Sequence, residues 1–244
     1  MDCFIVGQFR KRNTRAYEFQ KGPANQKSFG CIAATHKNLS GKDAAATKMA
    51  AKGTCVMALM TGEQYVESMR KLNLQVYMFG KKIENPVDDP ILRPSLNSVK
   101  ATYDLAQDPE YADLMTAKSI LTGETINRFT HIHQSTDDLI KKVKMQRLCG
   151  QKTAACFQRC VGMDAFNAVY STTYETDEKY GTHYHENFKK FLQYVQEHDY
   201  TVDGAMTDPK GDRSLPPHLQ ADPDLYLRVV ERRPDGIVVR GAKA

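Results

Sequence analysis

The sequence lacks several patterns that would assign it directly to a functional class. No apolar run approaches the roughly 20 residues of a membrane helix, and the longest, CVMALM at residues 55–60, is far too short. Neither a Walker loop nor a GxGxxG fingerprint is present, and no Ser/His/Asp arrangement stands out. An acid follows Met1, and no apolar segment with a cleavage site comes after it. We therefore expect a cytoplasmic globular protein without a membrane partner.

Acidic residues are scarce in the first 57 positions. These positions contain ten Lys and Arg residues and three acidic residues, which gives a net charge of +7. Residues 58–244 have a net charge of −2. Periodicity is absent, so we expect an irregular or disordered arm, or a stretch translated from upstream of the true start. A transit peptide and a nucleic-acid tether are the functional alternatives. Aromatic residues do not alternate with basic patches, so we expect no nucleic-acid partner.

Helical and strand patterns begin near Thr61, which has Gln64 three residues on, the spacing of a capping box. A short hairpin is predicted at residues 75–85, a helix of about three turns at 96–108, and a second hairpin with a Thr-Gly turn at 119–129. A long helical region follows residue Ser135, which we expect Gly150 to divide in two. Another helix is predicted at 186–199, with an apolar stripe at helical spacing.

The sequence pattern changes from helical to loop and strand after residue 200. A Pro- and Gly-containing loop leads to two predicted strands joined at Pro234-Asp235-Gly236, a hairpin signal. We predict an α+β fold, with a helical domain at 58–200 followed by the first strands of a β domain at 201–244. Two strands alone cannot bury both faces or protect their edges, so the β domain is expected to be truncated.

Two cysteines four residues apart, Cys156 and Cys160 in QKTAACFQRCVG, form the first candidate site. On one helix they would share a face, where two thiolates can bind one metal centre. The same spacing is typical of two small buried residues, so spacing alone leaves both interpretations open. A closed site needs four ligands. Further candidate ligands are Cys149, His183 and His185. His131 and His133 form a separate pair, which could bind a metal, although a loop that enters a helix is favoured.

The loop MTDPKGDR is the second candidate site. Its backbone N–H groups and cations could hold a phosphate-bearing cofactor or a flavin edge, but the spacing alone favours a plain surface turn. Its residues are Met206, Thr207, Asp208, Pro209, Lys210, Gly211, Asp212 and Arg213.

Whole segments of residues 58–244 resemble the N-terminal part of the 4-hydroxybutyryl-CoA dehydratases, within the wider 4-hydroxyphenylacetate 3-monooxygenase family. These segments include LMTGEQYVESMRKLN, VYMFGKKIENPVDDPILRPS, VDGAMTDPKGDR and DGIVVRGAKA, besides the region around the two cysteines. The resemblance implies an acyl-CoA-dehydrogenase-like fold, FAD, a 4Fe-4S cluster, a CoA-thioester substrate and a homotetramer. It implies that Cys156 and Cys160 are cluster ligands and that residues 206–213 contact the flavin.

The resemblance also implies what this sequence leaves out. Family members continue past VRGAKA and supply a His, a third Cys and the acid–base residues from beyond that point. We therefore expect this chain to be an N-terminal portion that is inactive alone, with its catalytic residues beyond Ala244. The alternatives are a flavin-dependent aromatic hydroxylase, or a non-catalytic remnant or subunit that needs a separate C-terminal half.

Overall fold

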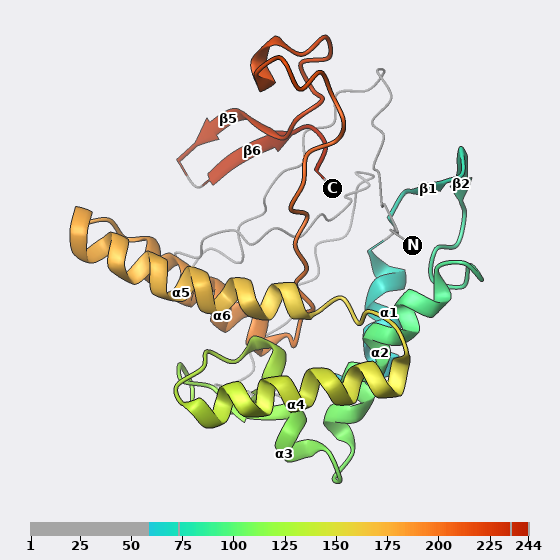
Figure 1. Ribbon diagram of the computed structural model, residues 1–244, viewed down its shortest axis with the longest axis vertical. Helices are drawn as coiled ribbons and strands as arrows, with labels where there is room; N and C mark the ends of the chain where they lie inside the picture. The colour runs from blue at the N-terminus through green and yellow to red at the C-terminus, as the bar shows by residue number, and fades with distance from the viewer. Residues whose placement is uncertain (1–58, 73, 235, 244) are drawn as a thin grey trace, which may run out of the picture.

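The computed structural model describes residues 59–72, 74–234 and 236–243. The predicted arm at 1–57 lies outside these residues. Within them, the helices alternate with two short hairpins, and the longest hairpin comes last along the chain (Figure 1). The helices are α1 (Gly62–Lys71), α2 (Arg93–Gln107), α3 (Ala112–Met115), α4 (Thr136–Thr153), α5 (Cys160–Tyr180) and α6 (Tyr184–Glu197). The strands are β1 (Val76–Met78), β2 (Lys81–Ile83), β3 (Thr116–Lys118), β4 (Thr125–Asn127), β5 (Arg228–Arg233) and β6 (Gly236–Arg240).

Helix α1 begins as the sequence predicts. The Thr61 hydroxyl accepts from the Gln64 N–H, and the Gln64 side chain accepts from the Thr61 N–H, so the capping box is complete. The helix packs on α2, where the rings of Tyr65 and Tyr103 stack with centroids 5.0 Å apart. Helix α2 is longer than predicted, because it starts at Arg93 with Pro94 in its first turn.

Three antiparallel hairpins make up the paired strands of the described chain. The β1–β2 turn uses Gly80 at φ +75°, a conformation that glycine adopts without strain. The β3–β4 hairpin contains the predicted Thr-Gly turn, but its first strand lies at Thr116–Lys118, before the predicted segment. A 3-10 turn, η1 (Arg128–Thr130), then leads toward α4.

The prediction that Gly150 divides the long helical region is wrong. The N-terminus of α4 has the expected Ser135 cap, completed by Asp138 as a capping box. Gly150 lies within the helix and does not break it, since α4 runs on to Thr153. The helix ends instead at Ala154, which adopts a left-handed conformation with φ +50°. Glycine lowers helix propensity by only about 1 kcal/mol, which tertiary contacts around α4 overcome.

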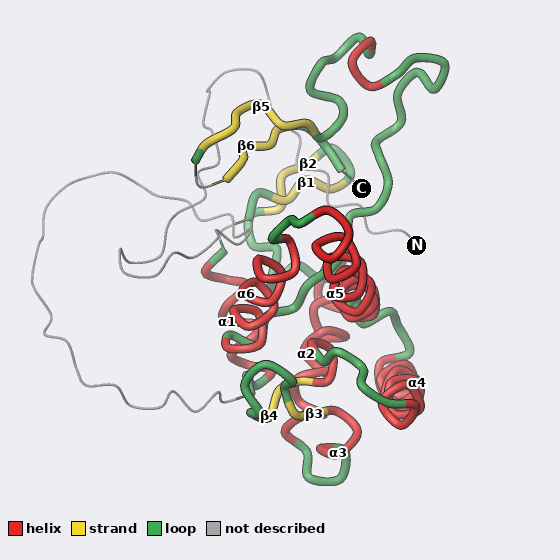
Figure 2. Tube along the Cα trace, turned by 90° about the vertical axis from the view of Figure 1, so that its left-hand side faces the viewer, coloured by secondary structure: helices red, strands yellow, loops and turns green. Residues whose placement is uncertain are grey.

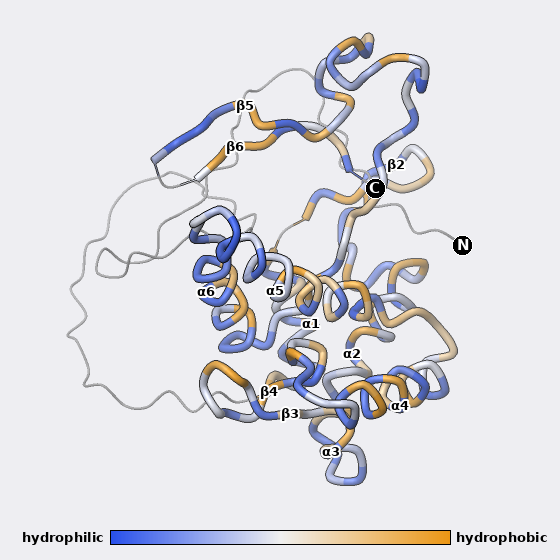
Figure 3. Tube along the Cα trace, turned by 60° about the vertical axis from the view of Figure 1, so that its left-hand side comes forward, coloured by the Kyte–Doolittle hydropathy of each residue, from blue (hydrophilic) through white to orange (hydrophobic). Residues whose placement is uncertain are grey.

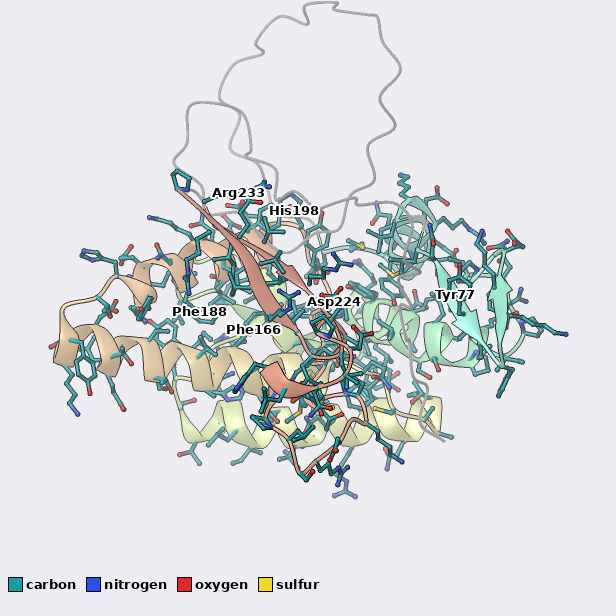
Figure 4. The ribbon with its side chains drawn as sticks, turned by 90° about the horizontal axis from the view of Figure 1, so that it is seen from above. Tyr77, Phe166, Phe188, His198, Asp224 and Arg233 are labelled. Carbon is teal, nitrogen blue, oxygen red and sulfur yellow. The ribbon has the colours of Figure 1, made fainter. Side chains whose placement is uncertain are left out.

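Helices α5 and α6 form an antiparallel pair joined by a turn at Gly181, whose φ is +64°. Figure 4 shows Phe166 of α5 and Phe188 of α6 on facing sides of the two helices. Their ring centroids are 6.2 Å apart. Leu192 and Val195 of α6 are buried in the same cluster, as the predicted apolar stripe requires.

The chain after α6 leaves the helices as an irregular segment. It passes through a second 3-10 turn, η2 (Pro217–Leu219), and reaches the β5–β6 hairpin. The hairpin pairs Arg233 with Gly236 across the predicted turn, of which Asp235 is not described. Figures 1 and 2 show the hairpin at the opposite end of the molecule from α3 and α4. The predicted domain division at residue 201 remains a prediction.

Buried apolar side chains form three clusters in the helical part. The first joins α2, α3, α4 and α5 around Met145 and Phe129, the second joins α5 and α6, and the third joins α1 and α2. Figure 3 shows hydrophobic and hydrophilic residues alternating along these helices, as expected for amphipathic helices. Among the described residues, no helix combines the length and apolar character needed to cross a membrane.

Candidate cofactor site

The two cysteines lie at the connection between α4 and α5, and the prediction of one shared helix face is wrong. Cys156 sits in the loop, and Cys160 is the first residue of α5. The loop needs two non-glycine residues at positive φ, Ala154 at +50° and Gln158 at +59°. It therefore turns the chain back within six residues, so the thiols are carried by a bent loop and a helix N-terminus.

The thiols differ in their surroundings. Cys156 is exposed, whereas Cys160 is partly buried against the first apolar cluster. Burial raises the pKa of Cys160, and the nearby Cys156 thiol raises that pKa further. Two thiolates therefore repel each other here, and a bound cation would relieve that repulsion and displace their protons. The start of α5 adds positive potential that favours thiolates.

The other predicted ligands do not join this pair. Cys149 is fully buried inside α4, and burial raises the pKa of its thiol to about 11. His183 and His185 lie beyond the far end of α5, about 30 Å from its first residue, because α5 has 21 residues. In the part of the chain that the structure describes, no group of three His, Cys, Asp or Glu could hold a metal ion. Cys156 and Cys160 can thus supply two ligands.

His131 and His133 lie in the segment that leads into α4, which agrees with the predicted helix-entry loop. The His131 Nε2 lies 3.2 Å from Asp138 Oδ1, and Asp138 accepts from the Gln134 and Ser135 N–H groups. Burial lowers the pKa of His131, an effect that Asp138 opposes. His131 borders a surface cavity of about 520 Å³ beside the β3–β4 hairpin. Arg128 also lines this cavity, but its guanidinium donates to the carbonyls of Leu114 and Thr116. Arg128 therefore has a structural role.

Arg159, which no sequence pattern indicated as a functional residue, lies directly before Cys160. Its side chain is 1 % exposed and lies between two rings, 4.4 Å from the Tyr103 centroid and 4.8 Å from that of Phe129. Its Nη1 donates to the Thr102 hydroxyl at 3.1 Å. An arginine between two cysteines carries no sequence signal of burial, because arginine is almost always exposed.

The loop at residues 206–213 is an exposed irregular segment with a fixed shape. The Gln220 side chain accepts from the Asp212 N–H and donates to the Asp212 carbonyl, at 2.9 and 2.7 Å. A Cβ on Gly211 would come within 2.6 Å of the side chains of Gln220, Leu225 and Tyr226, so a larger residue here would require these side chains to move. Lys210 and Arg213 are exposed, and both can reach an anionic ligand. The two predicted sites are thus separate in the chain, one at the start of α5 and one after α6.

Comparisons with known proteins show which family this chain belongs to. Residues 61–244 match the family described as 4-hydroxyphenylacetate 3-hydroxylase N terminal. The chain is 74% identical to the 4-hydroxybutyryl-CoA dehydratase/vinylacetyl-CoA-Delta-isomerase of Clostridium aminobutyricum, over 76% of this chain and 38% of that protein. It is 28% identical to the 4-hydroxyphenylacetate 3-monooxygenase oxygenase component of Thermus thermophilus, over 75% and 37%.

Solved structures of proteins from the same family also match this chain. The oxygen-tolerant 4-hydroxybutyryl-CoA dehydratase from N. maritimus matches with a TM-score of 0.69 and 51% identity, covering 76% of this chain and 37% of that one. The oxygenase component of 4-hydroxyphenylacetate 3-monooxygenase, complexed with FAD and 4-hydroxyphenylacetate, matches at 0.61 and 26%, covering 75% and 38%. The chain spans well under half of the relatives it matches. With its family match over three-quarters of its length, the chain belongs to the 4-hydroxyphenylacetate 3-hydroxylase N-terminal family.

Proposed function

We propose that this chain forms the N-terminal part of a 4-hydroxybutyryl-CoA dehydratase that also isomerises vinylacetyl-CoA. The observation that carries the proposal is the 74% identity to the Clostridium aminobutyricum enzyme, which bears both activities in its name. At that identity, side chains that contact the substrate or a cofactor are expected to persist. The proposed substrate is therefore a CoA thioester, and the proposed fold is acyl-CoA-dehydrogenase-like, in a homotetramer.

We propose FAD and a 4Fe-4S cluster as cofactors. Cys156 and Cys160 would supply two cluster ligands, which suits their donor chemistry because iron–sulfur clusters are held by thiolates. Residues 206–213 would contact the flavin with backbone N–H groups and exposed cations. When bound, the cluster supplies a Lewis acid for the substrate hydroxyl, and the flavin supplies one-electron chemistry. This chain's own residues bind and orient these groups.

A flavin-dependent aromatic hydroxylase is the second candidate. The match to the oxygenase component with FAD and 4-hydroxyphenylacetate supports it. Against it stand the lower identity of 26% and the Cys156/Cys160 pair, because a flavin hydroxylase needs no cluster ligands. The dehydratase is therefore favoured.

A chimera tests the proposal directly. Residues 61–244 of this chain would replace the matching segment of the Clostridium aminobutyricum enzyme, and conversion of 4-hydroxybutyryl-CoA to crotonyl-CoA would be followed together with iron and flavin content. We expect turnover and full iron content in the chimera, and loss of both in Cys156→Ser and Cys160→Ser. Cys149→Ser is the matched control and should keep its iron. A chimera that folds and binds flavin but hydroxylates 4-hydroxyphenylacetate instead would favour the second candidate.

A further inference from the structure

Asp199 provides the counter-charge for the buried Arg159 at the start of α5. One of its carboxylate oxygens lies 3.6 Å from Arg159 Nη2, and both side chains are at most 4 % exposed. Its other oxygen accepts from the Met60 N–H at 3.0 Å. Burial raises the pKa of Asp199, and Arg159 opposes that rise. A buried arginine thus lies between two aromatic rings with the Asp199 carboxylate beside it.

The backbone at Asp199 is itself held in an uncommon conformation. Its φ is +47°, and its carbonyl accepts from the Tyr103 hydroxyl at 2.8 Å. The same hydroxyl lies 2.8 Å from the Thr201 hydroxyl. Tyr103 therefore contacts both members of the pair, through its ring to Arg159 and through its hydroxyl to the chain at 199–201. A positive φ in a non-glycine residue persists where surrounding contacts enforce it.

The chain after Asp199 runs along the first turn of α5. A Cβ on Gly162 would overlap the Val202 carbonyl oxygen, so the two backbones are in direct contact. A Cβ on Gly204 would come within 2.7 Å of the Val161 side chain. This segment continues directly into the loop at 206–213. The start of α5, which carries Cys160, is therefore in contact with the stretch that leads into the proposed flavin loop.

We propose that Arg159 and Asp199 are positioning residues for the thiol pair. They hold the Cys156 loop and the first turn of α5 in one arrangement against residues 199–204, so that both thiols can bind the same metal centre. This rests on the proposed function, in which the two cysteines are metal ligands. Neither residue needs to touch the metal. The buried pair fixes the backbone at Arg159. Cys160, one of the two proposed ligands, is the next residue in the chain.

The test measures metal binding by the thiol pair in the 244-residue chain. Cadmium alone is the probe, because its thiolate complexes give a charge-transfer absorption band. The parent carries Ser at Cys3, Cys31 and Cys55. Arg159→Lys keeps the charge but loses the planar group between the rings. Thr102→Val removes only the hydroxyl that accepts from Arg159, and Arg147→Lys on the exposed side of α4 is the matched control.

We expect Arg159→Lys to weaken cadmium binding about tenfold, as loss of outer-shell support typically does. Thr102→Val should shift affinity in the same direction by less, and Arg147→Lys should match the parent. Near-ultraviolet circular dichroism verifies folding of each variant, and Thr102→Val decides the question where Arg159→Lys does not fold. One outcome would overturn the positioning role of Arg159 and Asp199 and leave the metal site standing. In that outcome the folded Arg159 and Thr102 variants bind cadmium like the parent, and the Cys156→Ser/Cys160→Ser chain does not bind it. Unchanged binding in that cysteine double variant would overturn the metal site itself.

Discussion

Substituting Asp199→Asn tests how much the buried charge pair contributes to stability. Asparagine keeps an oxygen that accepts from the Met60 N–H, and it tolerates the φ of +47° better than most residues. The substitution therefore removes the charge and little else. At the 3.6 Å separation from Arg159, an effective dielectric constant of about 20 gives an attraction of about 4–5 kcal/mol.

The expected loss is about 3 kcal/mol of unfolding free energy, because a buried partner charge is left uncompensated. For a chain of this size that corresponds to a melting temperature lower by roughly 6–12 °C. Urea unfolding followed by circular dichroism measures it at neutral pH. The double variant Arg159→Met/Asp199→Asn should lie nearer the parent than Asp199→Asn, since no unpaired charge remains.

The same Asp→Asn change in an exposed pair provides the control. Asp104 pairs with Lys100 across one turn of α2, and both side chains reach solvent. Asp104→Asn should cost less than about 1 kcal/mol, as surface pairs do. A loss below about 1 kcal/mol for Asp199→Asn, or a double variant less stable than Asp199→Asn, would refute the reasoning.

Three further predictions concern thiol chemistry, packing and pH. Alkylation with iodoacetamide, read by peptide mass spectrometry, should label Cys156 first and Cys160 more slowly, and should spare Cys149 in the folded chain because burial raises its pKa to about 11. Met145→Ala should lower the unfolding free energy by about 3 kcal/mol in urea, because Met145 is fully buried in the first cluster. Stability should fall as pH drops below the ordinary histidine pKa of 6.5, since burial lowers the pKa of His131 and the unfolded chain binds that proton more readily.

The controls for these three follow from the same contacts. In urea all three thiols should react alike, and labelling of Cys149 as fast as Cys156 in the native chain would contradict its burial. Val143→Ala on the exposed side of α4 should change stability by less than about 0.5 kcal/mol. His131→Gln should flatten the decline between pH 7.5 and pH 5.5, values that bracket the histidine range. An equal decline in that variant would assign the pH effect elsewhere.

Local chemistry made several elements predictable. Capping boxes at Thr61 and Ser135 rest on side chains within three residues of the helix start. The hairpin at Pro234 and Gly236 rests on the conformations that those two residues favour. The apolar stripe of α6 follows from helical spacing alone. Each of these depends on neighbours in the chain, which is the information that a sequence displays directly.

The cysteine site could be predicted in part from the sequence, and the rest depends on tertiary contacts. The two thiols four residues apart can be read from the amino-acid order, and so can the resemblance of whole segments to a family with iron–sulfur and flavin cofactors. Long-range packing keeps Gly150 helical, bends the chain at Ala154 and buries Arg159 against Asp199. Contacts between positions 40 residues apart, packed against aromatic rings from two other segments, set that outcome, and no local pattern encodes such contacts.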